Sequence, residues 1–168
     1  MKLDPIIETP CMVTGLWRRF AVHLFEGKLP LDEMETLERA SETWHAKLTG
    51  KLVEMVVIFP SKAQMTSEER QRMTRIIKRW EHTRAASATV ILAQGLTGSL
   101  HRSVLTGMNM VVPAPHPMKV GGEVREAVHW LSPHTREVCG PDAKPEVVLD
   151  AIETLRERFA KRPVRAPG

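Results

Sequence analysis

Tyrosine is absent from this 168-residue sequence, which has only two cysteines, four tryptophans and four phenylalanines. Cys11 and Cys139 stand far apart and belong to no CxxC motif, which favours free thiols in a reducing compartment. No stretch approaches the roughly 18 consecutive apolar residues of a membrane span, and the first residues lack the pattern of a signal peptide. We therefore expect a cytoplasmic protein that does not span a membrane.

The sequence also lacks the motifs of common enzyme and metal sites. It contains no nucleophile elbow, no HExxH motif and no obvious Cys-His or Ser-His-Asp arrangement. Asp32 and Glu33 are adjacent, but the helix dipole already explains carboxylates at a helix start. The spacing of His129, His134 and Cys139 matches no closed zinc site, and a fourth ligand is missing. We expect no catalytic residues, no metal and no cofactor.

The chain suits one compact domain, because single domains typically hold about 100–150 residues. Its formal net charge is +4, and the basic residues concentrate between Arg70 and Arg84 and again after Arg156. Such a balance permits an acidic partner without requiring one.

Between Leu52 and Leu131, short apolar runs alternate with amphipathic stretches at helical spacing. Residues 52–59 are nearly all apolar, which is typical of a strand covered by helices on both faces. Before them, residues 6–16 form an irregular extended segment and residues 20–25 a second apolar run, which together predict a hairpin. The alternation predicts an α/β fold.

Helices are predicted between these strands. The first covers residues 31–48, carries an acidic outer face and stops at Gly50. The second begins at Thr66, whose side chain can cap the helix while Glu69, three residues on, bonds back to the cap.

The second half of the chain continues the alternation. Pro133 is expected to help end the helix that contains Leu131, and Pro145 suits the first turn of a final helix. The other predicted elements are strands at residues 88–93 and 118–120 and a helix that begins near residue 99.

This order of elements, together with residues 25–29 (FEGKL) and 126–131 (EAVHWL), resembles the SpoIIAA-like branch of the STAS superfamily. The resemblance covers residues 20–131. It implies a mixed, mostly parallel sheet of four to five strands with helices packed mainly on one side. It also implies a non-enzymatic regulatory or scaffolding module that binds a partner protein or a small ligand.

On this basis we divide the chain into three parts. Residues 1–134 are expected to form the STAS-like α/β domain, and residues 135–161 a linker with an additional C-terminal helix. Residues 162–168 are basic and are expected to be a disordered tail.

STAS antagonists carry a phosphorylatable serine at the start of the second helix, and the resemblance places residues 59–67 there. The candidate phosphoacceptors are Ser61, Thr66 and Ser67, although the stretch lacks the aspartate and glycine of the family motif. A phosphate would be favoured near a helix N-terminus. Helix capping alone also explains Thr66.

The second helix has the most distinctive predicted surface, and we expect Arg72, Arg75 and Arg79 to contact a partner protein. The other interpretation is a solvated basic face, and the absence of interleaved aromatics disfavours nucleic acid. The acidic first helix of one copy could also meet the basic second helix of another, which predicts a homo-oligomer.

Two alternatives belong to other functional classes. A hydrophobic or lipid-like ligand could be carried in a pocket lined by methionines, since SpoIIAA-like proteins also resemble the CRAL-TRIO lipid carriers. The candidates are Met55, Met73, Met108 and Met110. A small enzyme could instead use the loop between Gly95 and Ser99, where backbone amides could hold a phosphate.

Overall fold

A computed structural model describes residues 1–26, 28–60, 65–92 and 114–162 of the chain. The strands within these ranges are β1 (Asp4–Glu8), β2 (Met12–Trp17), β3 (Phe20–Glu26), β4 (Leu52–Phe59), β5 (Arg84–Ile91) and β6 (Met118–Gly121). The helices are α1 (Leu31–His45), α2 (Ser67–Arg79), the short 3-10 helix η1 (Glu81–Thr83), α4 (Val124–Cys139) and α5 (Pro145–Ala160). None of them combines the length and apolar character needed to cross a bilayer.

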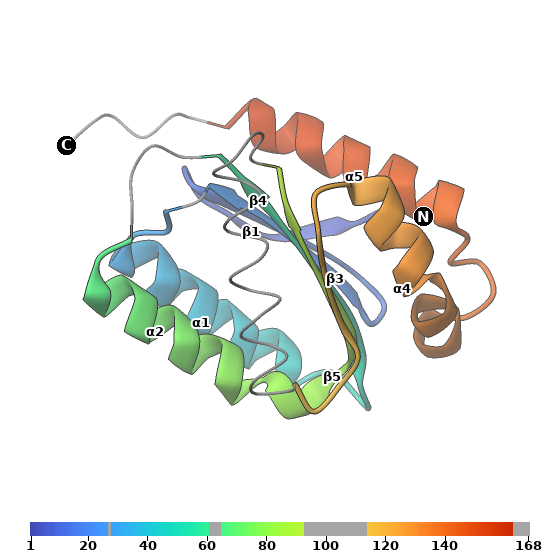
Figure 1. Cartoon of the computed structure of the whole chain (residues 1–168), viewed down its shortest axis with the longest axis horizontal. Helices are drawn as coiled ribbons and strands as arrows, with labels where there is room; N and C mark the ends of the chain where they lie inside the picture. The colour runs from blue at the N-terminus through green and yellow to red at the C-terminus, as the bar shows by residue number, and fades with distance from the viewer. Residues whose placement is uncertain (27, 61–64, 93–113, 163–168) are drawn as a thin grey trace.

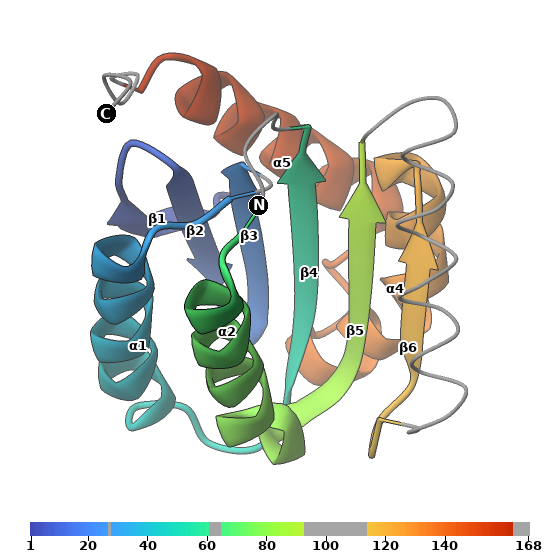
Figure 2. The ribbon, with the colours of Figure 1, turned by 60° about the vertical axis from the view of Figure 1, so that its left-hand side comes forward.

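The strands form one sheet in the order β1-β2-β3-β4-β5-β6 (Figure 2). β1, β2 and β3 pair antiparallel, whereas β3, β4, β5 and β6 pair parallel. The predicted mixed, mostly parallel α/β sheet is confirmed, but the described residues contribute six strands to it rather than four to five. The difference includes the N-terminal segment, which turns back between Thr9 and Met12 and forms two strands instead of one.

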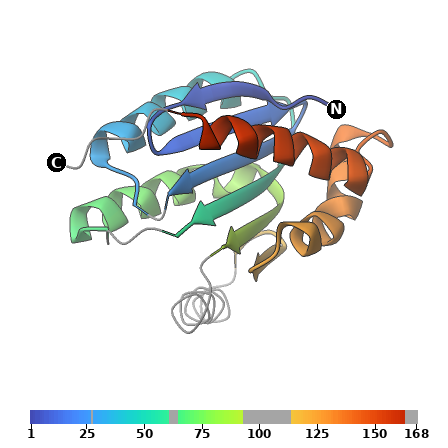
Figure 3. The same ribbon diagram turned by 90° about the horizontal axis from the view of Figure 1, so that it is seen from above.

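Helices cover both faces of the sheet. α1 and α2 lie on one face, and α4 and α5 lie on the other (Figures 1 and 3). The expectation of helices mainly on one side is therefore wrong, whereas the apolar run of β4 correctly indicated cover on both faces. The reason is that β4 lies between two parallel neighbours and presents apolar side chains to both faces of the sheet, so both faces must be covered.

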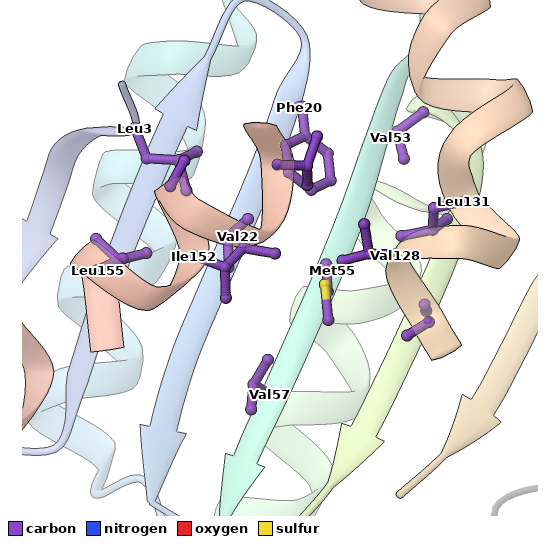
Figure 4. Close-up of a cluster of buried hydrophobic side chains, with 14 of the residues drawn as sticks. Leu3, Phe20, Val22, Val53, Met55, Val57, Val128, Leu131, Ile152 and Leu155 are labelled. Carbon is purple, nitrogen blue, oxygen red and sulfur yellow. The ribbon is translucent and has the colours of Figure 1, made fainter. Parts of the chain in front are cut away.

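The larger hydrophobic cluster lies beneath α4 and α5 (Figure 4). Val22 of β3 and Met55 of β4 are fully buried there, against Leu131 of α4 and Ile152 of α5. Smaller clusters lie beneath α1 and α2, where Trp44 packs with Ala21 and Leu52. Alternate residues of the central strands thus pack against different helix layers.

The end of α4 differs from the prediction, because Pro133 lies inside the helix, which continues to Cys139. An internal proline removes one backbone hydrogen bond and costs about 3 kcal/mol. Arg18 and Arg19, in the turn between β2 and β3, donate to the carbonyls of Cys139 and Val138, which lie in the last turn of the helix and have no partner within it. The expected boundary at 134/135 therefore falls within a helix.

The starts of α2 and α5 agree with the sequence patterns. Thr66 and Glu69 form the predicted capping box before α2, and Pro145 occupies the first turn of α5. α5 packs on β2 and β3, so the C-terminal helix belongs to the same core as the sheet. Arg162, placed in the expected tail, binds Glu26 and the carbonyl of Pro10. The rest of that tail lies outside the described residues.

Gly50 is the clearest position that requires glycine. Its φ is +84°, and an added Cβ would lie 2.9 Å from Nη1 of Arg19. Replacing Gly50 with alanine should lower the free energy of unfolding by about 1–2 kcal/mol, because the left-handed conformation is unfavourable for an L side chain. The matched control is Gly121→Ala, since an added Cβ at Gly121 meets nothing within 4 Å. Urea denaturation measures both; equal stabilities would contradict the assignment.

Cys11 and Cys139 are buried thiols that are not joined in a disulfide, and they belong to clusters on opposite faces of the sheet. Burial raises the pKa of the Cys139 thiol, which disfavours the reactive thiolate. In the folded protein neither thiol should react with a disulfide reagent within minutes, whereas both should react in guanidinium. Fast reaction of a thiol in the folded protein would show that one of these sites is open to solvent.

Candidate functional site

The three arginines that we expected to contact a partner differ in their contacts within the chain. Nε of Arg72 donates to Oε2 of Glu38 at 3.0 Å, and Nη1 of Arg79 lies 2.7 Å from Oε1 of Glu42. Both glutamates belong to α1, which lies beside α2 (Figure 2). Arg75 is exposed and forms no ion pair within the described residues. The acidic and basic helices therefore pair within one chain.

The outward side of α2 carries further groups that a partner could contact. Lys78 is exposed and, like Arg75, has no ion-pair partner in the described part of the chain. Ile77 is 47% exposed and is the one large apolar side chain that is exposed in the described part of the chain. We call Arg72, Arg75, Ile77, Lys78 and Arg79 the α2 surface.

The start of α2 holds two of the three candidate phosphoacceptors, Thr66 and Ser67, and both are exposed. The hydroxyl of Thr66 accepts a hydrogen bond from the amide of Glu69 at 3.2 Å, and the Glu69 carboxylate accepts from the amide of Thr66 at 2.6 Å. This amide and nearby Lys28 lower the pKa of Glu69. Thr66 thus has a structural role as the cap. Ser61 lies outside the described residues.

A buried polar row, which no sequence pattern predicted, crosses the sheet beneath α1 and α2. Thr14 of β2 and Nδ1 of His23 of β3 share a hydrogen bond of 3.0 Å, and Nε2 of His23 lies 3.2 Å from Oε1 of Glu54 of β4. Arg84 of β5 forms an ion pair with Glu54 and donates to the carbonyl of Ile77 at 3.1 Å. This last bond joins the row to α2.

The row explains the one charged residue in the apolar run of β4. Burial raises the pKa of Glu54, but Arg84, together with His23, outweighs burial and lowers it. Glu54 is therefore ionised at neutral pH. Its position within residues 52–59 was the available sequence signal, but its partners come from strands far apart in the sequence and follow no spacing rule.

Histidines surround this ion pair. His45, at the end of α1, stacks between Trp44 and Trp80 with ring centroids 3.9 and 4.1 Å apart. Nε2 of His116 and the hydroxyl of Ser87 are hydrogen-bonded at 2.9 Å. Desolvation lowers the pKa of His116, and nearby Arg84 lowers it further. No group of three or more potential metal ligands occurs within the ranges that the structure describes.

The methionines proposed to line one pocket do not lie together. Met55 packs beneath α4 and α5, whereas Met73 packs on the other face of the sheet. Met108, Met110 and the loop between Gly95 and Ser99 are outside the described residues. An open groove of about 450 Å³ lies between β1 and α5, with Leu3 and Leu155 among its lining residues.

The three residues considered as zinc ligands differ in exposure and contacts. His129 is exposed, His134 has a tilted ring contact with Trp130, and Cys139 is buried.

Comparison with known proteins supports the fold. No family model and no curated protein matches the sequence. A crystal structure from Shewanella loihica PV-4, described as an uncharacterized protein from the DUF3478 family with a SpoIIAA-like fold, matches with a TM-score of 0.57. The two chains are 14% identical, and the match covers 74% of this chain and 97% of that one. The chain therefore has a SpoIIAA-like fold, as the resemblance implied.

The His45 stack predicts a pH dependence of stability. Burial lowers the pKa of His45 from 6.5 to about 4, with Glu54 opposing the change and Arg84 adding to it. Between these two values the unfolded chain binds more protons than the folded one, so stability is lost as the pH falls from 6.5 towards 4. His45→Gln should make the fall in Tm over this window shallower.

The control is His129→Gln, which removes an exposed histidine from α4. Thermal unfolding followed by circular dichroism at several pH values measures the three slopes. Parallel slopes for wild type and His45→Gln would show that the stack does not contribute to the pH dependence.

Proposed function

We propose that this chain is a non-enzymatic regulatory or scaffolding module that binds an acidic partner protein through the α2 surface and the loop before it. The supporting observation is that Arg75 and Lys78, three residues apart on one side of α2, are both exposed and have no acidic neighbour paired with them in the described structure. Exposed cations on one side of a helix attract an acidic protein over a distance and orient it on contact.

The same surface is less suited to nucleic acid. The nearest aromatic ring, Trp80, stacks on His45 and contacts Arg79. Its faces are therefore occupied rather than available for a base. Self-association through α1 and α2 stays a prediction.

The experiment compares Arg75→Glu/Lys78→Glu with a variant of equal charge change on the opposite face, Arg125→Glu/Lys144→Glu. Arg125 of α4 and Lys144 before α5 are both exposed. Each immobilised protein is incubated with extract of its own host, and proteins retained by wild type are identified. Purified partner binding is then measured by calorimetry.

We expect the α2 variant to bind the purified partner at least about tenfold more weakly, because like charges would face each other across the interface. The control variant should bind as wild type does. Equal weakening in both variants would show that binding depends on net charge and not on the α2 surface. Unchanged binding in both variants would show that the partner contacts another part of the protein.

A further inference from the structure

Two of the four cations on the α2 surface are already bound by carboxylates of the same chain. Glu38 receives the guanidinium of Arg72, and Glu42 receives that of Arg79. The two glutamates are four residues apart, so they project from one side of α1 one turn apart. α1 thus shows, within the molecule, how α2 binds an acidic helix.

Polar contacts contribute much of the attachment of α2 to the molecule. Of its thirteen residues, only Glu69 and Ile76 are buried, whereas α4 and α5 each bury five. Other contacts of α2 are its ion pairs to α1, the ion pair of Glu69 with Lys28, the bond from Arg84 to the Ile77 carbonyl, the stacking of Trp80 on His45 and the packing of Met73. The ion pairs can be exchanged with less loss than a packed apolar interface, because water and salt already compete for them.

We propose that Glu38 and Glu42 are an internal competitor of the acidic partner, and that the partner presents an acidic helix whose carboxylates replace theirs at Arg72 and Arg79. This inference rests on the proposed function. Exchange begins at Arg79, because its side chain is 52% exposed and that of Glu42 is 47% exposed. Arg72 and Glu38 are 29% and 23% exposed and follow when the incoming helix lies along α2.

The test uses a defined probe rather than an unidentified partner. The probe is a synthetic alanine-based helical peptide with glutamate pairs spaced four residues apart. A control peptide has the same number of glutamates and two internal prolines that prevent helix formation. Binding is measured by fluorescence anisotropy for wild type, Glu38→Gln/Glu42→Gln, and Glu146→Gln/Glu157→Gln. The last variant removes two exposed carboxylates from α5, which lies on the other face of the sheet.

Glu38→Gln/Glu42→Gln should bind the helical peptide about three- to tenfold more tightly than wild type. The guanidiniums of Arg72 and Arg79 are unpaired in this variant, so the peptide does not have to displace an existing ion pair. The α5 variant should show less than half of that gain. Equal gains in the two variants would overturn the competitor, since only net charge would then matter. Equal binding of both peptides would overturn the acidic helix and indicate a general preference for polyanions.

Failure of the proposed function has a separate signature. If Arg75→Glu/Lys78→Glu binds the helical peptide as tightly as wild type, Arg75 and Lys78 are not part of the contact and the proposed function fails, whatever the glutamate variants do. If no variant binds the peptide, both proposals fail. Circular dichroism and Tm establish that each variant is folded, and Glu42→Gln alone, at the more exposed pair, provides a milder change that should retain a smaller gain.

Discussion

The parallel pairing of β4 with both β3 and β5 is the constraint on which the rest of the structure depends. A strand in the centre of a parallel sheet has neighbours on both sides, and its residues alternate between two faces that must both be covered. α4 and α5 cover one face with an extensive apolar cluster, and α1 and α2 cover the other. The helices therefore divide between two layers.

The two layers differ in chemistry, and the difference follows from Glu54. A carboxylate on the face beneath α1 and α2 requires compensation, which Arg84 and His23 supply from the neighbouring strands. Such a buried pair adds little net stability, because desolvation offsets much of the attraction. Its structural consequence is geometric: the Arg84 guanidinium reaches the Ile77 carbonyl and fixes the last turn of α2 over the sheet.

α2 consequently combines a held inner side with a charged, accessible outer side. The inner side is fixed by Ile76, the cap at Thr66 and the contacts of its last turn. The outer side presents Arg75 and Lys78. In the proposed binding module, the sheet and the α4 and α5 layer would carry the fold, and recognition would depend on α2, which is attached in part through ion pairs.

Local patterns in the sequence determined the elements whose signals are local. The apolar run predicted β4, the Thr66-to-Glu69 spacing predicted the start of α2, and Pro145 marked the start of α5. Tertiary contacts decided the continuation of α4 past Pro133, which Arg18 and Arg19 support from a distant turn, and the pairing of Arg72 with Glu38. The physical reason is that caps and periodicity act over a few residues, whereas the energy of an ion pair or a helix end depends on which distant groups the folded sheet brings within reach.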